Sequence, residues 1–189
     1  YLPHHGGDWI LPAVRAGRFR PTDDFALAAE ADAVLICVPT PLTDTWDPDL
    51  QYIEGTARAL SPRLRRPCLV VLESTTWPGT RREVLAPMLA GPGRVLGETL
   101  LVAFSPERED PGNAEHATGK VPKIVGGLDE PSARAAAALY GRLVPRVVPV
   151  RSAEVAESAK LLENIYRCVN IAMANEMKTI LDAMGIDVW

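Results

Sequence analysis

One stretch near the end of this 189-residue chain constrains its fold more than any other. Residues 151–185 contain no proline, and their one glycine, Gly185, is the last of them. The stretch therefore predicts a single helix with Ser152 at its N-cap and Gly185 at its end. At ~1.5 Å per residue this helix would be roughly 50 Å long, which is long for one small domain.

Two stripes run along this predicted helix. One is apolar, and its members follow one another at helical spacings: Val155, Leu162, Tyr166, Val169, Met173, Ile180 and Met184. The other is mostly polar and consists of Glu157, Lys160, Asn164, Cys168, Ile171 and Asn175. A polar row on a helix that also has an apolar face suggests a site around Lys160 and Asn164. For a lone Lys-x-x-x-Asn spacing, however, solvated side chains are the commoner explanation.

The rest of the chain alternates apolar runs with helical segments. The predicted strands are residues 33–38, 68–72, 99–104, 123–125 and 146–150, and the predicted helices are residues 25–30, 49–61, 81–89 and 131–143. Because residues 33–38 and 68–72 are apolar without alternation, we expect both strands to be buried on both faces in a parallel sheet. The order predicts an α/β fold: a partial doubly wound, Rossmann-like parallel sheet over residues 1–151, followed by the long helix of residues 152–189.

Ligands of doubly wound sheets bind outside the carboxyl ends of the strands. The loops expected at that edge, residues 39–41, 73–80 and 105–110, are rich in hydroxyl groups and prolines. The sequence has neither a Gly-x-Gly-x-x-Gly turn nor a P-loop, so no dinucleotide site is demonstrated by motif. The chain also starts without an initiator methionine, and no opening strand precedes the first predicted one, so we expect it to be the interior of a longer protein.

Composition excludes several classes of protein. A net charge of -4 gives no electrostatic case for binding nucleic acid or an anionic membrane surface, and no apolar run approaches the length of a membrane span. Cys37, Cys68 and Cys168 lie in apolar segments without a Cys-x-x-Cys motif, so we expect buried free thiols in a reducing, cytoplasmic compartment. His4 and His5 are adjacent, which is a poor spacing for metal ligands, and no metal is expected.

Five blocks of sequence, taken in order, are more specific than any one of them. They are residues 31–41, 73–80, 103–108 with 111–113, 123–127, and 160–164 with 169–172 and 175–176. Together they resemble the nucleotide-sugar dehydrogenases, the UDP-glucose/GDP-mannose dehydrogenase family, which oxidise the C6 alcohol of a UDP- or GDP-sugar to a carboxylate with two NAD. The block at 105–113 is most similar to the UDP-N-acetylglucosamine 6-dehydrogenases. The implied substrate is UDP-N-acetylglucosamine or UDP-N-acetylmannosamine, with UDP-glucose and GDP-mannose as alternatives.

The resemblance implies which residues border NAD. On the first loop they are Val38, Pro39 and Thr40, and on the second loop they are Ser74 and Thr75. Thr75 is also implied as a candidate catalytic residue, because its hydroxyl could hold a water molecule for the reaction.

The resemblance also implies catalytic and substrate-binding roles. Glu107 matches the carboxylate that performs acid–base work at thioester hydrolysis, Lys160 the lysine that stabilises oxyanion charge, and Asn164 its hydrogen-bonding partner. At positions i and i+4 of a helix the last two side chains converge, and an ammonium with an amide donor suits an alkoxide or a tetrahedral oxyanion. Arg108 and Lys123 could contact a pyrophosphate or carboxylate, although solvated surface charge explains either equally well.

Two parts of the family pattern do not occur in this chain. The family's nucleophilic cysteine lies beyond the helix that carries Lys160, and the chain stops at Trp189; Cys168 falls where the resemblance predicts no catalytic thiol, and we expect it to pack. The glycine-rich NAD turn is missing too. The resemblance therefore implies the later part of an NAD-binding domain over residues 1–151, and over residues 152–189 the helix that opens the central, dimerisation domain. A homodimer through this helix and an inactive fragment are expected.

Two other classes of protein share parts of this pattern. The beta-hydroxyacid dehydrogenases also have a lysine and an asparagine four residues apart on a long helix, but they carry a glycine-rich run shortly before the lysine. Residues 152–158 contain no glycine, which disfavours that class. The second alternative is a non-catalytic relative that serves as a dimerisation or binding module.

Overall fold

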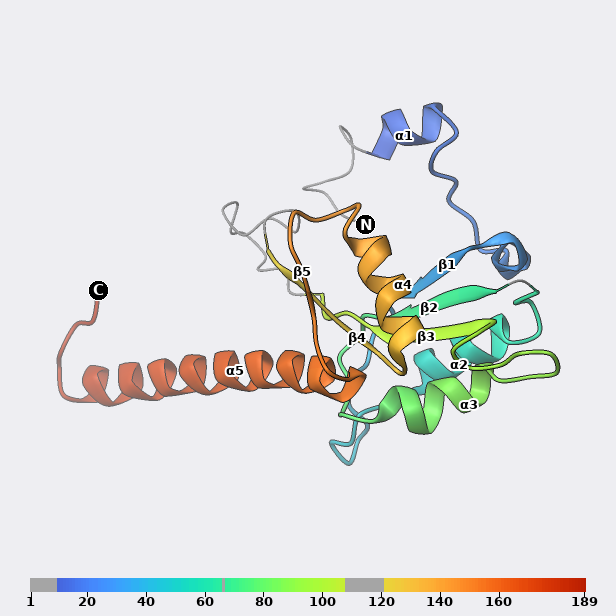
Figure 1. The fold of residues 1–189 in the computed structure, drawn as a ribbon. Helices are drawn as coiled ribbons and strands as arrows, with labels where there is room; N and C mark the ends of the chain where they lie inside the picture. Colours follow the sequence, from blue (N-terminus) through green and yellow to red (C-terminus); the bar gives the residue numbers. More distant parts are fainter. Residues whose placement is uncertain (1–9, 66, 108–120) are drawn as a thin grey trace.

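The computed structural model describes residues 10–65, 67–107 and 121–189, and within them the chain forms an α/β fold (Figure 1). Its five-stranded sheet has the order β1 (Ala33–Ile36), β2 (Cys68–Leu72), β3 (Leu100–Phe104), β4 (Lys123–Gly127) and β5 (Val147–Pro149). The helical segments are α1 (Leu11–Arg15), η2 (Phe25–Glu30), α2 (Gln51–Leu60), η3 (Arg81–Leu85), α3 (Ala86–Leu89), α4 (Glu130–Tyr140) and α5 (Ala153–Ala183). The predicted α/β class is confirmed.

Strand direction follows the prediction except at one pair. Strands β1, β2 and β3 are parallel, as are β4 and β5, but β4 runs antiparallel to β3 with Phe104 opposite Gly126. The sheet is therefore mostly parallel, as predicted, with this one antiparallel pair. As a result Lys123, at the start of β4, lies at the edge where β1–β3 end.

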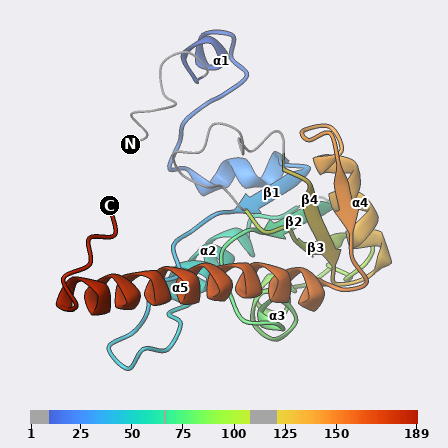
Figure 2. The ribbon, with the colours of Figure 1, turned by 90° about the vertical axis from the view of Figure 1, so that its left-hand side faces the viewer.

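Helices cover the sheet on both faces (Figure 2). On one face, Val70 and Leu72 of β2 pack with apolar residues of α2, η3 and α3; on the other, Leu69 and Val71 pack with Ala136 and Tyr140 of α4. All five residues of β2 are buried, as predicted. Burying a valine or leucine side chain typically contributes ~1.5–3 kcal/mol, so this strand and its two helical layers hold the described residues together.

Strand β1 is less buried than its sequence predicts. Ile36 is buried, but Leu35 is 42% exposed. Among the described residues β1 pairs with β2 alone, so it is an edge strand and one of its sides has no neighbouring strand. The expectation that residues 33–38 are buried on both faces is therefore wrong.

The predicted helix at residues 81–89 is divided. Its first half, η3, has π-helical hydrogen bonding and its second half, α3, is α-helical. Pro87 explains the change, because it has no N–H to bond the carbonyl one turn earlier. Cysteine burial also differs from expectation: Cys68 is buried, whereas Cys37 and Cys168 are exposed, and all three thiols are free.

The long helix α5 begins and ends where the sequence predicts. Ser152 is its N-cap residue in an extended backbone conformation, although its side chain makes no capping hydrogen bond to the backbone. Gly185 has φ +74° and donates to the carbonyl of Asp182, while Ile186 donates to that of Leu181, which is a Schellman motif. Most of α5 projects away from the sheet (Figure 1).

Exposure along α5 follows from this projection. Within α5, which the structure describes in full, the buried residues are Ala153, Ala156 and Glu157. The predicted apolar stripe is exposed in this chain, with Leu162 at 67% and Val169 at 60%. In the described part of the chain no helix is both long and apolar enough to cross a bilayer.

Candidate active site

The carboxyl ends of β1 and β2 are joined by a side-chain hydrogen bond. The hydroxyl of Ser74 donates to the carbonyl oxygen of Val38 at 2.7 Å, so the two loops that the sequence assigns to NAD lie side by side. Ser74 is buried, Val38, Thr40 and Thr75 are half-buried, and Pro39 is exposed. Their contact with NAD stays a prediction, but their common place at this edge of the sheet is a property of the fold.

Glu73 is a buried carboxylate for which neither the sequence pattern nor the family resemblance predicts a role. It accepts a hydrogen bond from the hydroxyl of Tyr140, its Oε1 lies 3.5 Å from Nζ of Lys123, and its Oε2 lies 3.7 Å from the thiol sulfur of Cys37, which donates to it. The position of Glu73 in the sequence could have indicated a buried ion pair. An acidic residue directly after a wholly apolar buried strand needs partners, because an unpaired buried charge is costly.

Lys123 lies between two carboxylates. Its Nζ is 2.6 Å from Oε2 of Glu107 and 5.1 Å from the centroid of the Tyr140 ring, in addition to its contact with Glu73. The lysine side chain is 8% exposed, so solvated surface charge does not describe it. Glu107, with 35% of its side chain exposed, is the member of this group that faces the outside.

These charged residues line a cavity of about 200 Å³ at the sheet edge. Its lining combines Glu73, Glu107, Lys123 and Tyr140 with the apolar residues Leu35, Leu143 and Val144. Four strands, through Leu35, Glu73, Glu107 and Lys123, and the region around α4 therefore converge on one small cavity with charged and apolar lining.

Lys160 reaches the same edge from α5. Its ammonium group donates a hydrogen bond to the backbone carbonyl of Glu73. Burial lowers the pKa of Lys160, and the negative charges of Glu73 and Glu107 oppose this effect. Asn164 lies one turn further along the helix and is half-buried. The structure thus brings Lys160 and Glu107, two of the predicted catalytic residues, into one cluster of charges.

The nearest thiol to this cluster is held in its protonated form. Although Cys37 is exposed as a residue, partial desolvation of its thiol, together with the charge of Glu73, raises its pKa to about 11. Burial and the hydrogen bond to Glu73 also raise the pKa of Tyr140, which remains a neutral donor. Since a thiolate is the nucleophilic form of cysteine, Cys37 is unsuited to covalent catalysis. Cys168 lies exposed on α5, so the expectation that it packs is wrong for this chain.

Some of the predicted residues lie outside the described part of the chain. They are Arg108, residues 111–113, His4 and His5. Within residues 10–65, 67–107 and 121–189, no group of three or more His, Cys, Asp or Glu side chains could hold a metal ion.

Comparison with known families identifies the class to which this fold and this edge site belong. The NAD binding domain model of the UDP-glucose/GDP-mannose dehydrogenase family matches residues 5–144, and the central domain model of the same family matches residues 154–189. The chain belongs to the UDP-glucose/GDP-mannose dehydrogenase family.

Individual relatives agree with this assignment. The chain is 41% identical over 187 residues to the NDP-N-acetyl-D-galactosaminuronic acid dehydrogenase of Ralstonia nicotianae, covering 95% of this chain and 44% of the relative. It is 38% identical over 191 residues to the UDP-N-acetyl-D-mannosamine dehydrogenase of Salmonella typhimurium, covering 97% and 44%. The solved GDP-mannose dehydrogenase from Pseudomonas aeruginosa, a ternary complex, superposes with a TM-score of 0.83 at 29% identity, covering 94% of this chain and 42% of that one. The chain therefore spans less than half the length of these relatives.

Proposed function

We propose that the full-length protein oxidises the C6 alcohol of a UDP-sugar to the uronic acid with two NAD, through a thioester on a cysteine outside this chain. The observation that carries the proposal is the meeting of Lys160, Glu107 and the Ser74 loop at one edge of the sheet, although they come from separate elements. Family membership supports the same reaction.

The substrate we propose is a UDP-N-acetylhexosamine. The curated relatives named above are an N-acetyl-D-galactosaminuronic acid and an N-acetyl-D-mannosamine dehydrogenase, and the loop at 105–113 resembles enzymes of UDP-N-acetylglucosamine. UDP-glucose and GDP-mannose are the alternatives, the latter being named for a structural neighbour.

NAD, when bound, would supply the acceptor for the hydride that leaves the C6 carbon, and the residues that would hold its nicotinamide and ribose are those of the loops after β1 and β2. The fit rests on the chemistry at that edge: Val38, Pro39, Thr40, Ser74 and Thr75 offer hydroxyls and backbone groups. The Ser74 hydroxyl hydrogen is already donated to a carbonyl, which leaves its oxygen free to accept.

The residues near the start of α5 and just after β3 act on the C6 oxygen and on the proton that moves at thioester hydrolysis. Lys160 holds a partly desolvated ammonium, which stabilises negative charge on the C6 oxygen as it develops. Asn164 adds an amide donor one turn away. Glu107, paired with Lys123 and with 35% of its side chain exposed, takes and returns the proton at thioester hydrolysis.

The test is an assay of the full-length protein. With NAD and a panel of UDP-N-acetylglucosamine, UDP-N-acetylmannosamine, UDP-N-acetylgalactosamine, UDP-glucose and GDP-mannose, we expect two NADH per sugar oxidised and the highest kcat/KM with an N-acetylated sugar. Absence of NADH formation with every sugar would overturn the proposal and favour a non-catalytic binding or dimerisation module.

We further propose that the full-length protein is a cytoplasmic homodimer whose interface includes α5. The exposed apolar stripe of this helix supports the dimer, because contiguous apolar surface of this kind marks interaction sites. Free thiols support a reducing compartment.

A further inference from the structure

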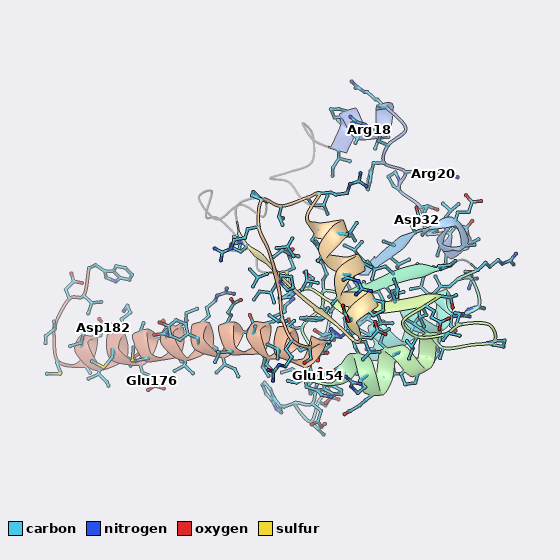
Figure 3. All side chains as sticks on the ribbon, viewed as in Figure 1. Arg18, Arg20, Asp32, Glu154, Glu176 and Asp182 are labelled. Atoms are coloured by element: carbon cyan, nitrogen blue, oxygen red, sulfur yellow. The ribbon has the colours of Figure 1, made fainter. Side chains whose placement is uncertain are left out.

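One short segment is held by successive turns of α5. Residues 73–82 run from the end of β2 through the Ser74 loop into η3. Three side chains of α5, spaced three residues apart, contact this segment: Glu154, Glu157 and Lys160. Figure 3 shows Glu154 where α5 meets the body of the fold, whereas Glu176 and Asp182 lie on its projecting half.

Glu157 makes the most buried of these contacts. Its side chain is fully buried, its Oε2 accepts a hydrogen bond from the backbone N–H of Gly79 at 2.7 Å, and the same oxygen lies 3.2 Å from Nη2 of Arg81. The Arg81 side chain is 1% exposed, and its guanidinium carbon lies 4.9 Å from the centroid of the Phe104 ring.

Stability alone does not account for this pair. Burying two charges costs a large desolvation free energy, and apolar residues of similar volume often serve as well or better. Within the described residues, Nε and Nη1 of Arg81 and Oε1 of Glu157 have no hydrogen-bond partner. Burial lowers the pKa of Arg81 to about 10, so the guanidinium is still charged at neutral pH. Because this buried ion pair is costly and some of its polar atoms lack hydrogen-bond partners, we infer that its role is to fix the position of the elements that it joins.

The position that it fixes is that of Lys160. Lys160 follows Glu157 by one turn and binds the carbonyl of Glu73, the first residue of the segment, while Glu157 binds Gly79 and Arg81 at the other end. The loop between these two anchors contains Ser74 and Thr75. Both ends of the loop are thus attached to neighbouring turns of one helix.

We propose that Glu157 is a positioning residue: with Arg81 as its counter-ion, it fixes the register of α5 against residues 73–81 and so holds Lys160 at the NAD-bordering loop. The kinetic part of this inference rests on the proposed dehydrogenase function. The structural part, that Glu157 orders the loop, does not.

The first experiment compares Glu157→Gln with Glu154→Gln in the full-length protein. Gln retains an oxygen for the Gly79 amide but loses the charge that holds Arg81. Displacing a reacting group by about 1 Å can lower turnover ~100-fold, so we expect kcat to fall about tenfold to 100-fold while KM for the UDP-sugar changes little. Glu154 forms an exposed pair with Arg82 on the same segment, and its variant should retain wild-type kcat.

A second variant keeps the proposal testable if Glu157→Gln does not fold. The double variant Arg81→Met/Glu157→Leu removes both charges and the acceptor for Gly79, and the melting temperature should stay near or above that of the wild type. We expect kcat to stay low in this stable protein. Recovery of wild-type kcat together with stability would show that the pair has a structural role only and would overturn the proposal.

Hydrogen exchange separates this inference from the proposed function. In the double variant, amides of residues 73–81, that of Gly79 above all, should exchange faster than in the wild type while the sheet stays protected. Unchanged protection overturns the inference whether or not the protein is active. A wild-type protein that produces no NADH overturns the proposed function, and the exchange result still decides the role of Glu157.

Discussion

At the scale of single residues, the site depends on a row of opposite charges that alternate across four elements. Glu107 at the end of β3, Lys123 at the start of β4, Glu73 after β2 and Lys160 on α5 follow one another through the contacts described above. Because the two lysines and two carboxylates balance, removal of any one of them leaves an uncompensated charge in a partly buried site.

Replacement of Lys160 by alanine should remove the charge that stabilises the C6 oxygen. In the full-length protein we expect kcat to fall by about 10²–10³, the range for loss of one oxyanion donor, with NAD affinity nearly unchanged. Steady-state kinetics and NAD titration check this. The control is Lys178→Ala, which removes an exposed lysine paired with Asp182 on the same helix. Near wild-type turnover in Lys160→Ala would refute the assignment.

The depressed pKa of Lys160 predicts the alkaline side of the pH–rate profile. Burial lowers this pKa below 10.5, so the ammonium loses its proton, and its stabilising charge, at a lower pH than an exposed lysine would. We expect kcat to decline with an apparent pKa below 10.5. In Lys160→Arg the charge persists, so that decline should disappear even if the rate is low. An unchanged alkaline limb in this variant would assign the limb to another group.

At the scale of elements, helix ends and the most buried strand could be predicted from local sequence. The burial and direction of strands that depend on their neighbours in the sheet could not. The ends of α5 follow from Ser152 and Gly185, and β2 follows from an unbroken apolar run. The exposure of Leu35 could not be predicted, because a strand's burial depends on whether another strand lies beside it. The antiparallel β4 was likewise not encoded in any local pattern.

The site was predictable to a similar extent. The family resemblance predicted roles for Lys160 and Glu107, and the fold brings their charges close together. The partners of Glu73, which are Tyr140, Lys123 and Cys37, come from three distant segments, so spacing along the chain carried no information about them.

The start of α5 packs so closely against Gly126 of β4 that only a residue without a side chain fits there. A Cβ at Gly126 would lie 2.5 Å from the carbonyl oxygen of Ser152 and 2.8 Å from Cα of Ala153, so Gly126→Ala should push the start of α5 away from the sheet. We expect a loss of about 1–3 kcal/mol in the free energy of unfolding. Denaturant unfolding measures it.

The matched control is Gly55→Ala. Gly55 lies exposed within α2, and no atom lies within 4 Å of a Cβ built there, so this change should raise the free energy of unfolding by about 0.5–1 kcal/mol. Equal effects of the two alanines would contradict the close approach of α5 to β4.

The first turn of α5 should make folding sensitive to acid. Although burial raises the pKa of Glu154, hydrogen bonds from Ser152, its own backbone N–H and Arg82 lower it to about 2, below the ordinary 4.5. A carboxylate whose pKa is lowered on folding stabilises the protein above its unfolded value and loses that contribution as pH falls. Unfolding experiments should therefore show a loss of stability from about pH 4.5 to about pH 2 that is smaller in Glu154→Gln.

At the scale of the whole molecule, the apolar stripe of α5 has no partner within the described chain. We expect the full-length protein to sediment as a dimer, and Leu162→Glu with Val169→Glu to weaken association at least tenfold, because each change places a charge in an apolar interface. The control is Glu176→Gln on the same projecting half. A full-length protein that stays monomeric at all concentrations, with the stripe covered by its own following domain, would refute the dimer.

Because α5 projects from the fold, a small change of angle at its start becomes a large displacement at its far end. The helix is anchored over its first turns and extends for about 45 Å at ~1.5 Å per residue, so a tilt of about 10° at its base would displace its far end by roughly 8 Å. Two copies joined along such helices could meet in a reproducible geometry only if each base were rigid. The buried contacts of Glu157 with residues 79–81 therefore set the angular precision with which the far half of the helix is presented.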